Sequence, residues 1–309
     1  MRAVRIHQYG GTDTLQLEQI DTPKINADDI LIKVKAAAIN PVDWKIREGY
    51  LQEFIPYLLP VTLGWDVAGI VTAVGAQVTE FKVGDEVFSR PDISRDGSYA
   101  DYISVKADEA VLKSAKLDFA QAAALPLAGI TAWQCLVDVG QLSAGQRVLI
   151  HAGAGGVGHL AIQIAKAQGA TVIATASTAN QDLLTQLGAD QAVDYTKAPL
   201  NEQIEPVDLI LDTMGGKVQE QSWALLKKGG MLVSVADQPS EEVAKAHGVK
   251  AAFVFIEPSS RILRELNTLV EANQLTPLIE HRFPLEQIAE AHLQSQTGRT
   301  RGKIVIEVS

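Results

Sequence analysis

The sequence has little of what a disulfide framework, a membrane span or a basic binding surface needs. Among 309 residues there is one cysteine, Cys135, so no disulfide can form within the chain and a cytoplasmic location is expected. No stretch offers about 18 clean apolar residues, and the first residues lack the apolar core of a signal peptide, so we expect no membrane partner. The net charge of −10 disfavours nucleic acid as a partner, because its phosphates reward a basic face.

What the sequence has is the balance of an ordinary globular protein with two domains. Hydrophobic residues make up 47% and charged residues 21% of a chain that is long for a single core. The first 120 residues contain short apolar segments separated by turn residues, a pattern typical of a compact β-rich domain. The expected strands cover residues 30–36, 67–74, 82–88 and 97–105.

From about Leu117 onward, helix-like and strand-like segments alternate. A helical stretch interrupted at Pro126 is followed by six short apolar segments that predict strands, at residues 148–151, 171–176, 191–193, 207–211, 231–236 and 251–256. This βαβ rhythm predicts a doubly wound parallel sheet. We therefore expect a β-rich domain over 1–120, an α/β domain over 121–260, and a C-terminal segment over 261–309 with one helix and one strand.

A glycine-rich turn, Gly153-x-Gly155-x-x-Gly158, separates a predicted strand from a predicted helix. Gly153 allows a tight turn, and Gly155 leaves room for a pyrophosphate. Gly158 lets the helix pack closely on the strand. The helix N-terminus then offers free N–H groups to the phosphates. In this context the pattern predicts a dinucleotide-binding site that also includes Gly156 and Val157, with a plain tight turn as the alternative.

Seven motifs in a fixed order carry a family resemblance. The motifs are AINPVDWK at 38–45, GWDVAGIV at 64–71, KVGDEV at 82–87, GSYADY at 97–102, LAGITA at 127–132, the glycine-rich turn, and RGKIV at 301–305. Together they resemble zinc-independent members of the medium-chain dehydrogenase/reductase superfamily, on the quinone oxidoreductase (zeta-crystallin-like) branch. The Asn-Pro-Val-Asp-x-Lys variant of the first motif also resembles plant alkenal/enone reductases.

The resemblance implies an α/β fold with a GroES-like β-rich domain and a Rossmann domain that holds a doubly wound parallel sheet. It also implies that the C-terminal segment returns to the first domain, that the substrate cleft lies between the domains, and that the protein is a homodimer.

The resemblance also bears on metal. Zinc-dependent members carry a Gly-His-Glu turn where this sequence has Gly64-Trp65-Asp66, and Asn40 falls near the first cysteine ligand position. The six histidines show no metal-ligand spacing. We therefore expect no metal site and no Lewis-acid oxidation of alcohols.

Without a metal, the remaining chemistry is transfer of hydride from a reduced nicotinamide to an electrophile such as a quinone or an α,β-unsaturated carbonyl. Such acceptors need positioning and a donor to the developing oxyanion. By the resemblance, Asn40, Asp43 and Lys45 line the cleft as the catalytic candidates. The alternatives are a backbone-anchoring role for Asn40, a structural turn carboxylate at Asp43, and for Lys45 either an ion pair with Asp43 or a solvated surface position.

The resemblance implies further cofactor contacts at Thr131 and Lys303. NAD enzymes usually carry an acid about 20 residues beyond the glycine-rich turn, where this chain has Ser177. A hydroxyl tolerates a 2′-phosphate, and Tyr195 matches a tyrosine that meets this phosphate in the quinone reductases. The basic residue found there in the family is missing, although Lys197 could substitute for it.

We therefore expect NADP as the cofactor, with NAD as the alternative. One hydrogen bond from Ser177 to a charged group predicts a preference for NADPH of roughly tenfold to a hundredfold. For three aromatic residues near the expected cleft, Tyr50, Tyr57 and Trp65, ordinary packing is favoured over a role in the cleft.

The leading hypothesis is an NADPH-dependent, zinc-independent oxidoreductase that transfers hydride to quinones or α,β-unsaturated carbonyls. A zinc-free alcohol or aldehyde reductase and a non-catalytic NADPH-binding sensor or structural protein stay open as alternatives. The loop from Glu48 to Pro60, expected to shape the substrate site, has no readable code for one substrate.

Overall fold

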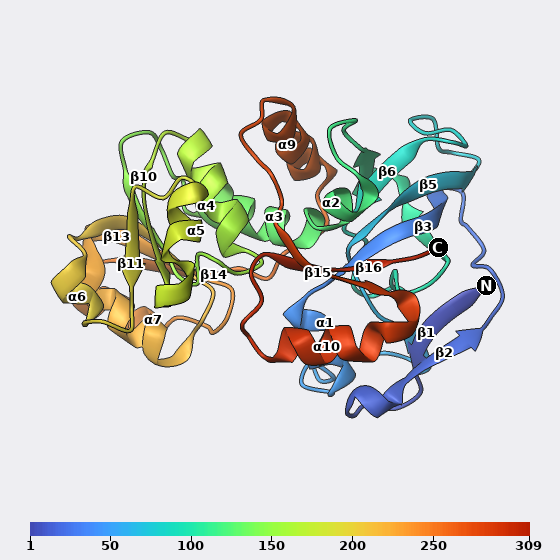
Figure 1. Ribbon diagram of the computed structural model, residues 1–309, viewed down its shortest axis with the longest axis horizontal. Helices are drawn as coiled ribbons and strands as arrows, with labels where there is room; N and C mark the ends of the chain where they lie inside the picture. The colour runs from blue at the N-terminus through green and yellow to red at the C-terminus, as the bar shows by residue number, and fades with distance from the viewer. The chain divides into compact units, whose positions relative to one another are not determined.

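The computed structural model describes residues 1–309 (Figure 1). The chain divides into two units, of which the first contains two sheets and the second contains one. The first unit consists of Met1–Leu127, Glu257–Glu271 and Pro277–Ser309, and the second consists of Ala128–Ile256 and Ala272–Thr276. The chain from Glu257 to its C-terminus thus belongs to the first unit, apart from Ala272–Thr276, which belong to the second. The domain boundaries expected from the sequence stay a prediction.

The first unit is built on a seven-stranded, mostly antiparallel sheet with the order β15-β16-β3-β5-β6-β8, in which β7 also pairs with β3. A second sheet has the order β2-β1-β4. The β-rich first domain is therefore confirmed. Its strands are β1 (Arg2–Ile6), β2 (Leu15–Gln19), β3 (Asp29–Ile39), β4 (Val61–Thr62), β5 (Val67–Val74), β6 (Glu86–Ser89), β7 (Tyr102–Lys106), β8 (Ala110–Leu112), β15 (Ile279–Pro284) and β16 (Lys303–Glu307). Its helices are α1 (Pro41–Arg47), α2 (Phe119–Ala123), α9 (Ser260–Glu271) and α10 (Ile288–Gln296).

Strand β3 is the centre of the larger sheet, and its sequence explains how it is placed. Ile30, Ile32 and Val34 alternate with less buried residues, as a strand with one face toward a core requires. Toward its end the strand is buried on every residue. There it pairs with the C-terminal strand, with Ala38 opposite Val305 in antiparallel register. The last strand of the chain therefore completes the sheet of the first unit.

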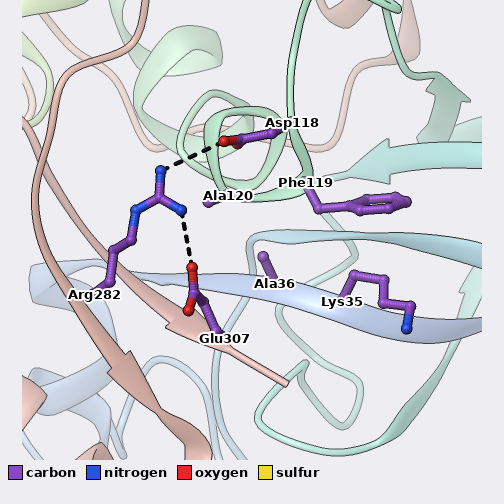
Figure 2. A pocket seen from close by; sticks show the side chains of 7 residues that line it. All are labelled: Lys35, Ala36, Asp118, Phe119, Ala120, Arg282 and Glu307. Carbon is purple, nitrogen blue, oxygen red and sulfur yellow. Dashed lines mark hydrogen bonds and ion pairs between the residues drawn. The ribbon is translucent and has the colours of Figure 1, made fainter. Parts of the chain in front are cut away.

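A groove of about 240 Å³ lies over the second half of β3 and the last residue of β16, beside α2 (Figure 2). In it, Arg282 binds the carboxylates of Glu307 at 2.9 Å and Asp118 at 3.5 Å, and Lys35 lies on β3. None of the predicted site residues lines this groove. Its other lining residues are Ala36, Phe119 and Ala120.

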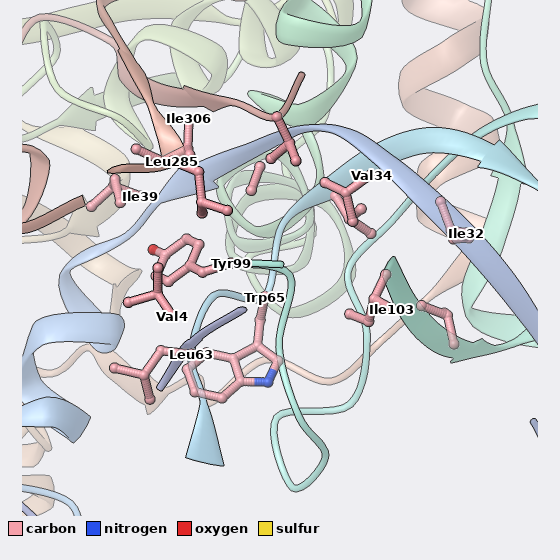
Figure 3. Close-up of a cluster of buried hydrophobic side chains, with 14 of the residues drawn as sticks. Val4, Ile32, Val34, Ile39, Leu63, Trp65, Tyr99, Ile103, Leu285 and Ile306 are labelled. Carbon is pink, nitrogen blue, oxygen red and sulfur yellow. The ribbon is translucent and has the colours of Figure 1, made fainter. Parts of the chain in front are cut away.

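The main core of the first unit joins both of its sheets. Figure 3 shows Val4 of β1 and Ile32 of β3 contributing to one cluster with Leu63, Trp65 and Tyr99. All five side chains are almost completely removed from water. Burial of each large apolar side chain stabilises the fold by about 1.5–3 kcal/mol, so this cluster dominates the stability of the first unit.

The second unit has one six-stranded parallel sheet with the order β11-β10-β9-β12-β13-β14. Counted in chain order this is 3-2-1-4-5-6, so the predicted doubly wound sheet is confirmed. The order reverses between β9 and β12, which marks the carboxyl edge there as the place where ligands bind such sheets. The strands are β9 (Arg147–Ile150), β10 (Thr171–Ala176), β11 (Gln191–Asp194), β12 (Val207–Asp212), β13 (Leu226–Ser234) and β14 (Lys250–Phe253).

The helices of the second unit follow the strands as the βαβ rhythm predicts. They are α4 (Gly158–Ala167), α5 (Gln181–Gln186), α6 (Leu200–Gln203), α7 (Gly216–Ser222) and α8 (Glu241–His247). The helical stretch before β9 is interrupted at Pro126, as expected. Helix α2 ends at Ala123, and helix α3 (Pro126–Trp133) begins at the proline, where its missing N–H costs nothing. No helix of the structure has both the length and the apolar character needed to cross a membrane.

Candidate active site

Helix α1 and the residue before it carry the three predicted catalytic residues, and the first turn of the helix is fixed by its own sequence. Asn40 precedes the helix with extended backbone angles, and Pro41 takes the first helical position. The carboxylate of Asp43 accepts the N–H of Asn40 at 2.7 Å, so one of the otherwise unpaired N–H groups at this helix start is satisfied. The Asn-Pro-x-Asp sequence therefore sets where the helix begins.

Asp43 is completely buried. Its Oδ2 atom accepts both the Asn40 N–H and the hydroxyl of Tyr99, the latter at 2.6 Å, while its Oδ1 atom has no partner. Burial raises the pKa of Asp43 to about 7, although these two hydrogen bonds oppose the rise. The contacts favour the structural alternative for Asp43, and its assignment as a catalytic residue stays a prediction.

A buried ion pair lies directly behind the start of α1. The Lys303 ammonium donates to Asp66 Oδ2 at 3.0 Å and to Asn40 Oδ1 at 2.5 Å, and the Asn40 amide donates to Asp66 Oδ2 at 2.9 Å. The other carboxylate oxygen of Asp66 accepts the N–H of Leu127 at 2.6 Å. We call these four residues the Asp66 node.

The Asp66 node joins four segments that are far apart in the sequence. It connects the end of β3, the residue before β5, the first residue of β16 and the first turn of α3. Burial raises the pKa of Asp66, and the adjacent Lys303 ammonium opposes the rise. Removal of one partner from a buried pair costs about 3–5 kcal/mol, so each member depends on the others.

The node bears on two of the predicted site residues. Asn40 uses its side chain for Lys303 and Asp66, which agrees with the anchoring alternative for this residue. The ammonium of Lys303, which was predicted to contact the cofactor, is hydrogen-bonded to Asn40 and Asp66 and is 3% exposed. The catalytic role of Asn40 and the cofactor contact of Lys303 stay predictions.

Lys45 is the one predicted catalytic residue that reaches solvent. It is half-buried, and its ammonium lies 5.8 Å from the centre of the Trp44 ring. The ion pair with Asp43 considered from the sequence is not formed, because Asp43 points inward to Asn40 and Tyr99. The ammonium of Lys45 is therefore left with its protons available to a ligand.

The three aromatic residues near α1 differ in their surroundings. Trp65 packs in the core as expected, donates its N–H to the carbonyl of Arg95 at 3.2 Å, and stacks on Tyr57 with ring centres 6.0 Å apart. Tyr57 donates its hydroxyl to the carbonyl of Ile93. Tyr50 follows the end of α1 and is 65% exposed, and its ring packs edge-on against Trp44 with ring centres 6.3 Å apart.

The residues present do not fit a catalytic zinc ion. Trp65 and Asn40 stand where the resemblance places ligands, and neither supplies an imidazole or a thiolate. The ammonium of Lys303 lies against Asn40 and would repel a cation at that position. No group of three or more His, Cys, Asp or Glu side chains comes together in a way that could hold a metal ion.

The glycine-rich turn connects β9 to α4, and two of its glycines are required by packing. A Cβ atom at Gly153 would lie 2.8 Å from the side chain of Leu184, and one at Gly158 would lie 2.2 Å from the carbonyl oxygen of Ala152. Gly155 differs, because its Cβ would meet only that same carbonyl oxygen, in a tight contact at 3.2 Å, and no other protein atom within 4 Å beyond its chain neighbours. Packing therefore restricts position 155 less than the other two glycines, and a ligand can approach the backbone there.

The backbone of the turn fits an anionic ligand. The N–H groups of Gly156 and Val157 donate to no other backbone group, and α4 begins at the next residue. Unpaired N–H groups and the positive end of a helix dipole are the features that bind phosphate groups. The residues predicted from the sequence for the pyrophosphate are thus able to hold one.

Two residues predicted to contact the 2′-phosphate of the dinucleotide, Ser177 and Tyr195, lie at the carboxyl ends of β10 and β11. Ser177 follows β10, and its hydroxyl makes no capping hydrogen bond. Tyr195 follows β11 and is 57% exposed, while Lys197 is exposed and forms no ion pair. Thr131 is buried on α3. The cofactor contacts assigned to Thr131, Ser177 and Tyr195 stay predictions.

Sequence analysis missed two polar groups at this edge of the sheet. Asp194 is the last residue of β11 and carries a carboxylate next to Tyr195, which is the signal that could have drawn attention to it. His151 follows β9 and hydrogen-bonds the hydroxyls of Thr175 at 3.3 Å and Ser222 at 2.9 Å. Burial lowers the pKa of His151 to about 4, so this ring is neutral and links three segments.

Comparison with known proteins agrees with this geometry. The alcohol dehydrogenase GroES-like domain matches residues 26–115, and the zinc-binding dehydrogenase family matches residues 187–306. The chloroplastic NADPH-dependent alkenal/one oxidoreductase of Arabidopsis thaliana is 38% identical over 318 residues, which cover 99% of this chain and 79% of that protein.

Two solved structures are similar over the whole chain. The quinone oxidoreductase from Coxiella burnetii has a TM-score of 0.93 and 38% identity, covering 100% of this chain and 99% of that one. The quinone oxidoreductase from Escherichia coli complexed with NADPH has a TM-score of 0.90 and 27% identity, covering 99% of this chain and 100% of that one.

The fold, the glycine-rich turn and these relatives define an NAD(P)H-dependent reductase with a GroES-like and a Rossmann domain. The chain belongs to the medium-chain dehydrogenase/reductase superfamily, on its quinone oxidoreductase and alkenal/one oxidoreductase branch. The resemblance seen in the sequence is thereby confirmed.

Substitution of Gly155 tests the nucleotide site. In Gly155→Val the branched side chain would fill the open space of the turn, so we expect NADPH binding to be lost while the fold is kept. The smaller Gly155→Ala change should weaken binding less. Titration of NADPH followed by fluorescence measures the affinity, and circular dichroism checks the fold. Unchanged affinity in folded Gly155→Val would contradict the assignment.

Substitution of Asp43 tests its raised pKa. An unfolded aspartate has a pKa of about 3.9, whereas burial in the folded protein raises that of Asp43 to about 7. The native state therefore binds the extra proton, and the contribution of Asp43 to stability falls as the pH rises from about 4 to about 7. Asp43→Asn does not titrate and keeps an oxygen acceptor for Asn40 and Tyr99.

The free energy of unfolding of Asp43→Asn, relative to the unmutated protein, should therefore rise between about pH 4 and pH 7 and stay level above. Urea unfolding at several pH values measures this difference. Asp13→Asn, which removes an exposed acid from the same unit, serves as the control. A difference between Asp43→Asn and the unmutated protein that does not vary with pH would show that Asp43 titrates normally.

Proposed function

We propose that this protein is an NADPH-dependent reductase that transfers hydride to quinones or α,β-unsaturated carbonyls. The observation that carries the proposal is the set of side chains packed at the start of α1. Where zinc-dependent relatives are expected to have metal ligands, this chain has Trp65 and the Asn40–Asp66–Lys303 network. Acceptors that react without a Lewis acid are therefore the substrates that this site suits.

The cofactor, when bound, supplies a hydride from its reduced nicotinamide ring. The residues of the second unit suit its other parts. The N–H groups of Gly156 and Val157 and the start of α4 would hold the pyrophosphate, and the hydroxyl of Ser177 would donate a hydrogen bond to a 2′-phosphate. NADPH is supported by Ser177 in place of an acid after β10, and by relatives that are named for NADPH.

Lys45 suits the role of proton donor. Addition of hydride to the β-carbon of an enone leaves negative charge on the carbonyl oxygen, and a proton must then reach the substrate. The Lys45 side chain is half-buried beside Trp44, and its ammonium forms no ion pair with a carboxylate. It can therefore donate a proton to this oxygen. The Asp66 node supports Lys45 indirectly, because it holds Asn40, the residue that precedes the same helix. The homodimer and the cytoplasmic location remain expectations.

A panel of acceptors tests the proposed reaction. We expect oxidation of NADPH with quinones and with α,β-unsaturated aldehydes or ketones, and no useful oxidation of saturated alcohols, because no side-chain donor set is present to hold a metal that would lower the pKa of an alcohol. Treatment with a chelator should leave the activity unchanged. Turnover of saturated alcohols without reaction of quinones or enones would show that the proposal is wrong. Binding of NADPH without turnover of any acceptor would favour a sensor or structural protein.

Substitution of Lys45 separates its role from the reaction. Lys45→Met should lower turnover by about a hundredfold, the low end for loss of one general acid, while the affinity for NADPH stays the same. Lys33→Met, which removes an exposed lysine from β3, is the matched control. If Lys45→Met is as active as the control and enones still react, the reaction stands and water or another group is the donor.

A further inference from the structure

Asp194 lies at the edge of the sheet where the 2′-phosphate of the dinucleotide is expected. Strands β10 and β11 are parallel neighbours, and their last residues, Ala176 and Asp194, are partners in register. Ser177 follows Ala176 directly. The carboxylate of Asp194 and the hydroxyl of Ser177 therefore belong to adjacent strand ends at the carboxyl edge of the sheet, where doubly wound folds bind nucleotides.

The carboxylate of Asp194 is held in place by two threonines. Its Oδ2 atom accepts the hydroxyl of Thr178 at 2.5 Å, and its Oδ1 atom accepts the N–H and the hydroxyl of Thr196 at 2.9 and 2.6 Å. These hydrogen bonds lower the pKa of Asp194 below its ordinary value, so the group is charged at neutral pH. Because Thr178 is the residue after Ser177, this hydrogen bond holds the Asp194 carboxylate against the loop that begins at Ser177.

No ion pair neutralises this carboxylate. Lys197 acts on Asp194 electrostatically and lowers its pKa, but its ammonium forms no ion pair with the carboxylate. The segment that follows Ser177, from Thr178 to Gln181, has no charged residue. The rim of the proposed nucleotide site at the ends of β10 and β11 therefore carries a fixed carboxylate, with the Lys197 ammonium beyond ion-pair distance.

We propose that Asp194 is a specificity-determining residue whose negative charge disfavours the 2′-phosphate of NADPH, so that the protein binds NADH as well. The inference rests on the proposed nucleotide site. NAD-binding sites of this kind usually take their carboxylate from the end of the second strand. Here that position is Ser177, and the neighbouring third strand supplies the carboxylate in register. Asp194 therefore limits the preference that Ser177 alone would create.

Two opposite effects decide the preference. The Ser177 hydroxyl can donate a hydrogen bond to the 2′-phosphate, whereas Asp194 repels it through partly screened solvent. The repulsion acts within the screening length of about 8 Å at physiological salt, so it weakens as salt is added. We expect the preference of the unmutated protein for NADPH to lie below about tenfold, which is the low end expected from the Ser177 hydrogen bond.

The test compares nucleotides that differ only in the 2′-phosphate. Asp194→Asn removes the charge, and its amide can keep partners at Thr178 and Thr196. The affinities of NADPH, NADH, 2′,5′-ADP and 5′-AMP are measured by calorimetry for both proteins. We expect binding of NADPH and 2′,5′-ADP to become about threefold to tenfold tighter in Asp194→Asn, while binding of NADH and 5′-AMP stays the same.

Two controls separate this effect from a general change in charge. Glu220→Gln removes an exposed acid from α7 in the same unit and should leave the ratio of NADPH to NADH affinity unchanged. Added salt should raise that ratio in the unmutated protein, because it screens Asp194, and should raise it less in Asp194→Asn.

An unchanged ratio in Asp194→Asn, or the same change in Glu220→Gln, would overturn the role of Asp194 while leaving the nucleotide site intact. If the unmutated protein binds none of the four nucleotides, the proposed site and this inference both fall. The two failures are therefore distinguishable by the affinity of the unmutated protein alone.

Discussion

The ion pair between Asp66 and Lys303 is the interaction on which the arrangement of the first unit depends. Both side chains are buried, and a buried charge without a partner costs several kcal/mol. Asp66 can accept three donors at once, from Lys303, Asn40 and the N–H of Leu127. The pair therefore links the last strand, the first catalytic candidate and the start of α3. Each of these segments is far from the others in sequence, and no apolar contact would select one geometry for all four groups.

The functional residues divide into those that this network holds and those that remain free for ligands. Asn40 and Asp43 are buried, and their side chains hydrogen-bond groups at the start of α1 and in the Asp66 node. Lys45, on the same helix, reaches solvent with its ammonium unpaired by any carboxylate. In the second unit, the turn before α4 likewise leaves N–H groups unused. A rigid polar interior that presents a few unpaired donors is what preorganised stabilisation of negative charge requires.

Local patterns made part of this structure predictable from the sequence. The alternation of β3 predicts a half-buried strand, and the glycine-rich turn predicts the β9–α4 junction, because both depend on neighbours in the chain. The Asp66–Lys303 pair spans 237 residues, and no periodicity marks a buried polar contact at that separation. Asp194 was missed for a similar reason, since its relation to Ser177 exists only through the register of β10 and β11.

A double-mutant cycle on Asp66 and Lys303 tests most directly the claim that this pair organises the first unit. Asp66→Asn, Lys303→Met and the double variant would be unfolded in urea, and NADPH oxidation would be measured for each. Each single change should cost about 3–5 kcal/mol, because it leaves a buried partner unpaired. The double variant should cost less than the sum by about 2 kcal/mol or more, and all three should lose turnover. Additive effects within about 0.5 kcal/mol, with turnover unchanged, would contradict the account.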